Sequence, residues 1–518
     1  MSRPAHLRVL ALVTAGLAAC TPTDQVAEVV VKVVRGTADP LEVAAAQGQP
    51  AASIGSIAVR LVSDGQPAVS HEVALGASRS ITLDFAVPPA TGSRIVIRGQ
   101  RDGDKSVYSA GRSVPFDSTV GSRVEVPVFF GPVDSFTPIV GTLPGPRQGP
   151  AVAALGDTGA LLVGGYETTA TGVHLASPSL VVYRLGEPLA CGLDEGCVQG
   201  SAIPPPRRFA VAVALSDGTV LHGLGLLANG QPDASLYLTR ADGSTELLVL
   251  TGDAVPALYG AAAVALADGT VLLFGGDTGA SPVSSVYRVD IAARTSTLEV
   301  QRMAEPRRFA GAARLSTGQV LLVGGENSVG PSDTAELYKP GQPSRVVDGG
   351  AFSKARSVLL GPRVAPSLAV LAGDSVVIAG GGPEAAEVFR LDLGAAVGGF
   401  IDVTAPPTEL KSKAPALLRL SSGELLLVGG EAEGTAAPRA SAFTPATRQV
   451  FDDSSPTFVG SYRRIGPGAT LRANPALVTL SDGSVLLAGG GTLGVTASPT
   501  AANPGAAPVE ILVPAPLE

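Results

Sequence analysis

The chain has 518 residues and a formal net charge of −8 at pH 7, with 45% hydrophobic and 16% charged residues. This length allows two or more domains with substantial cores. No basic run is present that could follow a phosphate backbone, so we do not expect a nucleic acid as partner. The 64 glycines and 42 prolines interrupt nearly every window in which a long helix could form, which favours short strands joined by turns.

The first residues have the pattern of an export signal. Arg3, His6 and Arg8 precede an apolar segment at residues 9–19. A basic start followed by a short apolar run is typical of a secretory signal peptide, and this run is too short to span a bilayer. No other segment is apolar enough to cross a membrane, so we predict an exported protein that is not integral to the membrane.

The apolar segment ends in Leu17–Cys20, with the sequence LAAC, which resembles the lipobox of bacterial lipoproteins. The resemblance implies a signal peptide over residues 1–19, acylation of Cys20, and a lipidated tether over residues 20–25, and several acyl chains at one point give stable membrane attachment. Thr21 stands where an aspartate would favour the inner membrane, so by the same resemblance we expect the outer membrane. The alternative is an ordinary signal peptide in which the cysteine has no role.

The two other cysteines, Cys191 and Cys197, lie close together in one loop-like segment. In an exported protein this spacing predicts a local disulfide. A metal or catalytic site would need histidines or further cysteines nearby in the sequence, and none is close.

Residues 26–132 contain alternating segments that predict half-buried antiparallel strands, such as Ile57–Leu61, Ile81–Phe85 and Val124–Phe130. Several such strands in about a hundred residues suit a β-sandwich of immunoglobulin-like type. The cysteine and tryptophan hallmarks of a true immunoglobulin domain are absent from the segment. We interpret it as a spacer that holds the following domain away from the membrane.

From residue 133 to the end, a unit of about 50 to 60 residues repeats. Each copy has a strand of small apolar residues, a tight turn such as Asp217-Gly218, an apolar second strand that ends in two glycines, and a third strand with an aromatic residue. The glycine pairs are Gly164-Gly165, Gly275-Gly276, Gly324-Gly325, Gly380-Gly381, Gly429-Gly430 and Gly489-Gly490, with a degenerate copy at Gly223-Leu224-Gly225. The third-strand aromatics are Tyr183, Tyr237, Tyr287, Tyr338, Phe389 and Phe443.

This pattern resembles kelch repeats, whose units form the four-stranded blades of a β-propeller. The chain departs from that family because it has no tryptophan after the third-strand aromatic. The resemblance implies an all-β fold in which residues 133–518 form a seven-bladed kelch-type β-propeller. The chain stops after the third strand of the last copy, so we predict that Val133–Ile139 supplies the missing fourth strand and closes the ring.

Charged residues recur at fixed places in the copies. An arginine lies 18 residues before the second glycine in five of them, and a carboxylate follows the glycine pair in three. Hairpin geometry should bring these residues close to one mouth of the central channel, where arginine could capture carboxylate or phosphate groups. The candidate binding residues are Arg147, Arg207, Arg307, Arg363, Arg472, Asp277, Glu326 and Glu431. The alternative interpretation is that the arginines are structural and pair with acidic residues such as Glu336, Glu387 and Glu510.

The sequence contains no catalytic constellation that we can identify. The galactose-oxidase-like copper enzymes, which are kelch-type propellers, need two histidine ligands, two tyrosines and a cross-linked cysteine, and this segment has only His174 and His222. We therefore expect a monomeric, non-catalytic scaffold without cofactor or metal, anchored by lipid at the cell envelope, that binds an envelope protein or glycan. The alternative is a galactose-oxidase-like or other unrecognised propeller enzyme.

Overall fold

The structure is a computed structural model of the whole chain. It describes residues 8–12, 26–35, 54–64, 68–74, 80–101, 107–139, 143, 147–157, 159–169, 172–176, 179–185, 204–348, 355–382, 386–392, 397–403, 415–429, 440–445, 457–458, 460–466, 472–473, 475–492 and 509–515. In these ranges the only helical element is a short 3-10 turn, η2 (Ala372–Asp374), and all others are strands. The protein is therefore all-β, as predicted.

The N-terminal strands form one nine-stranded sheet with the order β1-β5-β2-β9-β7-β6-β3-β4, and β8 lies beside β6. The strands are β1 (Arg8–Leu12), β2 (Ala27–Arg35), β3 (Ile54–Val62), β4 (Val69–Ala74), β5 (Ser80–Val87), β6 (Ala90–Arg101), β7 (Val107–Arg112), β8 (Phe116–Ser118) and β9 (Arg123–Pro132). The three strands expected from alternation lie within β3, β5 and β9, so their prediction is confirmed. Alternate residues of β2, β3, β5, β6 and β9 form one apolar core. The immunoglobulin-like type remains a prediction.

Part of the predicted signal peptide lies along this sheet. β1 pairs with β5 in parallel, from Arg8 opposite Thr82 to Leu12 opposite Ala86. The predicted lipidation site Cys20 and the predicted disulfide between Cys191 and Cys197 lie outside the described residues.

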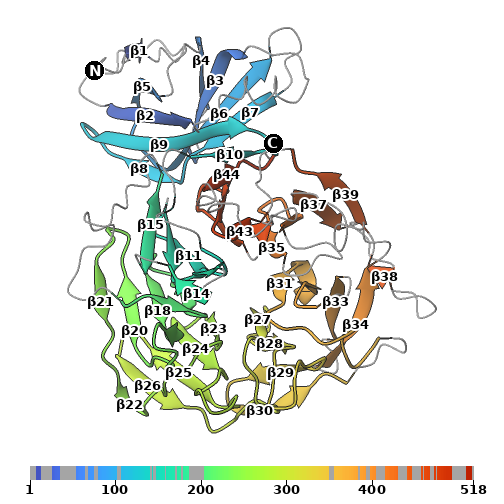
Figure 1. The fold of residues 1–518 in the computed structure, drawn as a ribbon. Helices are drawn as coiled ribbons and strands as arrows, with labels where there is room; N and C mark the ends of the chain where they lie inside the picture. The colour runs from blue at the N-terminus through green and yellow to red at the C-terminus, as the bar shows by residue number, and fades with distance from the viewer. Residues whose placement is uncertain are drawn as a thin grey trace.

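Among the described residues that follow β9, seven sheets succeed one another around a ring (Figure 1). Blades one to three are β11 (Ala151–Leu155), β12 (Gly159–Val163) and β15 (Leu180–Arg184); β17 (Val211–Ala214), β18 (Val220–Gly223), β20 (Leu236–Thr239) and β21 (Thr245–Leu247); and β23 (Ala262–Ala265), β24 (Thr270–Phe274), β25 (Val286–Asp290) and β26 (Thr295–Leu298), with β22 (Thr251–Gly252) outside β26. Blades four and five are β27 (Gly311–Arg314), β28 (Val320–Val323), β29 (Ala335–Lys339) and β30 (Gln342–Val346); and β31 (Ser367–Val370), β32 (Val376–Ala379), β33 (Glu387–Asp392) and β34 (Val397–Val403), with β38 (Thr457–Phe458) outside β34. Blades six and seven are β35 (Ala416–Arg419), β36 (Leu425–Val428), β37 (Ala440–Pro445) and β39 (Gly460–Arg464); and β41 (Ala476–Thr479), β42 (Val485–Ala488), β44 (Glu510–Leu512) and β10 (Phe136–Pro138).

Three short two-stranded pairs lie outside these sheets. They are β13 (Tyr166–Thr169) with β14 (Gly172–Leu175), β16 (Arg207–Arg208) with β19 (Leu226–Leu227), and β40 (Arg472–Ala473) with β43 (Gly491–Thr492).

The first strands of the blades form a closed inner ring. β11, β17, β23, β27, β31, β35 and β41 each contact the next, and β41 contacts β11. One apolar cluster fills the wedge between each pair of neighbouring blades. The cluster between blades seven and one also contains Ala110 and Phe129, so the N-terminal sheet packs at this seam. The prediction of a seven-bladed propeller is confirmed.

The last blade takes its outer strand from the start of the propeller segment. β10 pairs antiparallel with β44, with Phe136 opposite Leu512 and Pro138 opposite Glu510. The Phe136 side chain is buried between blades six and seven. The predicted closure by Val133–Ile139 is therefore confirmed, and it leaves the last blade without a free edge at this position.

Candidate functional site

Four of the five candidate arginines are buried inside the blades. Arg147, Arg207, Arg307 and Arg363, which we call the buried arginines, are at most 1% exposed. Each donates a hydrogen bond from Nη1 to the carbonyl oxygen at the end of the second strand of its own blade. The acceptors are Gly164 at 2.7 Å, Leu224 at 2.9 Å, Gly324 at 2.6 Å and Gly380 at 2.7 Å.

Carboxylates pair with Arg207, Arg307 and Arg363. Arg207 pairs with Asp233 at 2.9 Å, and Arg363 pairs with Glu387 at 2.9 Å. Burial raises the pKa of Glu387, and the positive charges of Arg363 and Arg356 oppose that rise. Burial lowers the pKa of Arg147 to about 10, so that this guanidinium also stays charged at neutral pH.

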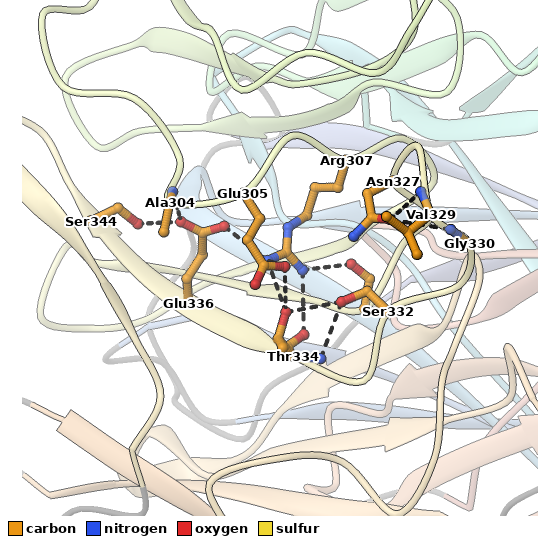
Figure 2. Close-up of polar contacts among 11 residues, drawn as sticks. Ala304, Glu305, Arg307, Asn327, Val329, Gly330, Ser332, Thr334, Glu336 and Ser344 are labelled. Atoms are coloured by element: carbon orange, nitrogen blue, oxygen red, sulfur yellow. Dashed lines mark hydrogen bonds and ion pairs between the residues drawn. The ribbon is translucent and has the colours of Figure 1, made fainter.

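Figure 2 shows the most extensive of these networks, around Arg307. Its Nη2 lies 3.1 Å from Glu305 and 3.1 Å from the fully buried Glu336. Thr334 Oγ1 accepts a hydrogen bond from Nη2 and donates one to Glu305. A buried, paired and hydrogen-bonded charge of this kind holds neighbouring segments together and is not accessible to a ligand.

The backbone of the same arginines joins each blade to the one before it. The second glycine of a pair donates its N–H to the arginine carbonyl of the next blade: Gly165 to Arg207, Gly276 to Arg307, Gly325 to Arg363 and, across the seam, Gly490 to Arg147. The first glycine has positive φ, and a Cβ on Gly324 would lie 2.4 Å from the Arg363 oxygen. In the degenerate blade two, Leu224 takes this place with φ 54°. The arginine and the glycine pair thus form a backbone hydrogen bond that joins neighbouring blades.

Two residues after the arginine position of the repeat, which Leu258 occupies in blade three, the chain repeatedly adopts left-handed backbone. The position is occupied in blades one to five by Gly149, Phe209, Gly260, Phe309 and Ala365, with φ of 52°, 58°, 63°, 54° and 52°. Three backbone hydrogen bonds join four of these residues in a row, because Gly260 donates to Phe209, Phe309 donates to Gly260 and Ala365 donates to Phe309. Left-handed backbone is unfavourable for phenylalanine, so the surrounding contacts must enforce it.

This backbone brings aromatic rings from four blades together. The centroids of Phe209 and Phe309, from the non-adjacent blades two and four, lie 4.9 Å apart in an edge-to-face arrangement. Tyr166 of blade one lies 5.8 Å from Phe209, and Tyr259 of blade three lies 6.0 Å from Phe309. Contact between blades that are not neighbours requires the rings to point inward from the ends of the inner strands. All four rings remain partly exposed.

Two arginines flank these rings. Arg308 bonds with Asp277 at 2.9 Å, Glu326 at 3.0 Å and the Tyr259 hydroxyl at 2.5 Å. Burial acts against the charge of Arg308, but Glu326, Tyr259 and Asp277 outweigh it and raise its pKa. Arg208 lies with its guanidinium 5.1 Å from the Phe209 ring centre, and within the described part of the chain no carboxylate pairs with it.

We call Tyr166, Arg208, Phe209, Tyr259, Arg308 and Phe309 the mouth cluster. The candidate residues Asp277 and Glu326 join it through Arg308. Arg472 lies in β40, where only its backbone is described, and Glu431 lies outside the described residues. The predicted spacing selected Arg207 and Arg307, whose neighbours Arg208 and Arg308 belong to the mouth cluster. Tyr259 was missed because Leu258 stands at the arginine position in blade three.

In the described residues, neither histidine of the propeller segment, His174 or His222, belongs to a group of side chains that could hold a metal ion. His222 is fully buried, bonds to Thr239 Oγ1 at 2.8 Å and stacks on Tyr237. Across the described ranges, no group of three or more His, Cys, Asp or Glu side chains is placed to hold a metal ion. The same ranges contain no helix long and apolar enough to cross a bilayer.

The fold places the protein in the class of seven-bladed β-propellers. No protein-family model matches the chain, and no curated protein matches its sequence.

Proposed function

We propose that this protein is a lipid-anchored, non-catalytic propeller of kelch type that binds a partner of the bacterial envelope through the mouth cluster. The observation that carries the proposal is the pair Phe209 and Phe309, held in left-handed backbone beside the cation Arg208. Unfavourable backbone persists where the surroundings enforce it, and it gathers at ligand sites. Tyrosine and arginine are among the residues that contribute most binding energy at protein interfaces, and phenylalanine is enriched there.

The preferred partner is a protein that presents an acidic side chain to Arg208. A carboxylate there would form a charge-assisted pair while apolar groups cover the aromatic rings. A glycan is the second candidate, since partly exposed aromatic rings also pack against sugar rings. Both candidate partners would bind at the mouth cluster.

Affinity capture from envelope extract tests this assignment. Arg208→Ala should lose the captured partner, whereas Arg302→Ala, which removes an exposed arginine outside the mouth cluster, should retain it. Both variants should fold like the original protein, because neither side chain is part of a buried pair. Equal capture by the two variants would overturn the assignment. Competition by soluble oligosaccharide would identify a glycan.

The anchoring half of the proposal depends on the lipobox-like motif. Processing before Cys20 would remove β1, and β5 would then become an edge strand of the N-terminal sheet, which we take to be an immunoglobulin-like spacer. Palmitate labelling of the original chain and its loss in Cys20→Ala would support acylation. Cell fractionation would then show whether the labelled protein enters the outer membrane.

The enzyme alternative can be separated from the scaffold by metal analysis. Stoichiometric copper in the purified protein would favour an oxidase of the galactose-oxidase-like kind. Capture of an envelope partner by metal-free protein would favour the scaffold.

A further inference from the structure

A second candidate site lies away from the mouth cluster, between the N-terminal sheet and the propeller. It is a pocket of about 860 Å³, which is the size of a small-molecule site. One wall comes from β3, β4, β6 and β7. The other comes from the turns at Ser421 and Asp482–Ser484 and from Val513–Ala515.

Strand pairing places four arginines on the sheet wall. In β3 and β6, Arg60 lies opposite Val96 and Arg98 lies opposite Ala58, while Arg94 lies opposite Val62. In β7, Arg112 lies opposite Val96 from the other side. The alternate residues of β3 and β6 form the apolar core, so these arginines point away from it and into the pocket. Alanine and valine residues separate the four arginines, both along each strand and between neighbouring strands.

The positive charges on this wall are poorly balanced. Within the described ranges, Arg60, Arg94, Arg98 and Arg112 form no ion pair and donate no side-chain hydrogen bond. Asp482 is the carboxylate that lines the pocket, and its Oδ1 is already bonded to the N–H and hydroxyl of Ser484 at 2.9 and 2.6 Å.

Another carboxylate on this face of the sheet is Glu72, opposite Ala58, which accepts a hydrogen bond from Ser56 at 2.5 Å. Burial and the positive charge of Arg94 lower the pKa of Arg112, and Asp482 opposes this. Like charges on one sheet face repel, and the whole chain has a net charge of −8. A local excess of positive charge in a concave, partly apolar space matches an anionic ligand.

We propose that this pocket binds a multivalent organic anion that carries phosphate or carboxylate groups on an apolar body. Guanidinium groups suit such oxygens because they form bidentate hydrogen bonds. Val62, Val96, Phe129 and Val513 supply the apolar lining. The bound anion contacts both the sheet and the propeller, so it stabilises their contact.

Titration calorimetry at low salt tests the pocket with defined probes, pyrophosphate for phosphate and citrate for carboxylate. The full chain is used with Cys20→Ala, so that acylation does not contribute. At least one probe should bind, and Arg94→Gln with Arg98→Gln should weaken it at least tenfold. Arg302→Gln, away from the pocket, should bind as before. Failure of both probes to bind, or equal binding by the double variant, overturns the proposal.

A second variant covers the case in which the double variant does not fold. Asp482→Asn removes the opposing charge and keeps an oxygen acceptor for Ser484, so it should tighten probe binding at least threefold. Unchanged or weaker binding would contradict the site.

Vesicle sedimentation then distinguishes the two sources of the anion. Arginine-dependent binding to phosphatidylglycerol vesicles, with none to phosphatidylcholine vesicles, identifies a lipid headgroup. Binding of the soluble probes alone identifies a soluble anion. Neither result depends on the mouth cluster, so this test and the capture experiment can fail separately.

Discussion

At the scale of single residues, His222 shows how a buried side chain makes stability depend on pH. Burial, together with the positive charge of Arg207, lowers the pKa of His222 to about 3. In the unfolded chain the pKa of histidine is about 6.5. Between these values the unfolded state binds the proton more tightly, so the stability present above pH 6.5 is lost as the pH falls towards 3.

We predict that His222 accounts for about 2 kcal/mol of the stability lost between pH 7 and pH 5. His222→Gln should keep the hydrogen bond to Thr239 but lack this loss, which urea unfolding at the two pH values would measure. His174→Gln, at an exposed position of β14, serves as the control and should behave like the original protein. An identical pH dependence in all three proteins would contradict the prediction.

The fixed spacing between the arginines and the glycine pairs is evident in the sequence. It did not show whether each arginine is structural or binds a ligand. Arg207 and Arg208 are neighbours, and one is buried in a blade while the other flanks the mouth cluster. Adjacent side chains in extended backbone point to opposite sides, and the repeat does not say which side is buried. The left-handed backbone at Phe209 could not be predicted from the sequence either, because phenylalanine disfavours this conformation.

At the scale of elements, the first glycine after the second strand avoids both left-handed strain and a clash with the next blade. At Gly324, φ is 59° and a Cβ would meet the Arg363 oxygen of the next blade at 2.4 Å. We predict that Gly324→Ala lowers the free energy of unfolding by about 2–4 kcal/mol, from left-handed strain and the clash together.

Gly318 is the matched control, since its φ is 79° but no atom lies within 4 Å of the added Cβ. Gly318→Ala should cost only about 1–2 kcal/mol. The two variants would be compared by urea denaturation. Equal losses would show that the contact between blades adds nothing to the strain.

Strands formed by local sequence were predictable, and the repeat also predicted that β10 closes the ring, whereas several parallel pairings between distant strands were not predicted. Alternation and tight turns identified the hairpins of the propeller and the strands in β3, β5 and β9. The parallel pairings of β2 with β9, β22 with β26 and β34 with β38 were missed. Two-residue periodicity shows which face of a strand is buried, but it does not identify a neighbour that is remote in sequence.

At the scale of the whole molecule, ring closure depends on a few residues of β10. Phe136 is 1% exposed and packs with blades six and seven. We predict that Phe136→Ala lowers the free energy of unfolding by about 3–5 kcal/mol, with a smaller loss for Phe136→Leu. Urea denaturation measures both.

Val300→Ala is the control for this prediction, because Val300 is 90% exposed and its loss should change stability by less than about 0.5 kcal/mol. A Phe136→Ala protein as stable as this control would mean that the ring does not need the closing strand.

The short connection between β9 and β10 also has a mechanical consequence. β9 ends at Pro132 and β10 begins at Phe136, so the N-terminal sheet is tied to the ring at its seam. With the proposed anchor at the N-terminus, tension between membrane and bound partner would enter the propeller through β10. The pull would run along this strand, and its backbone pairs with β44 would resist together in shear. Tension would therefore be shared between blade seven, through those pairs, and blade one, through the continuous chain.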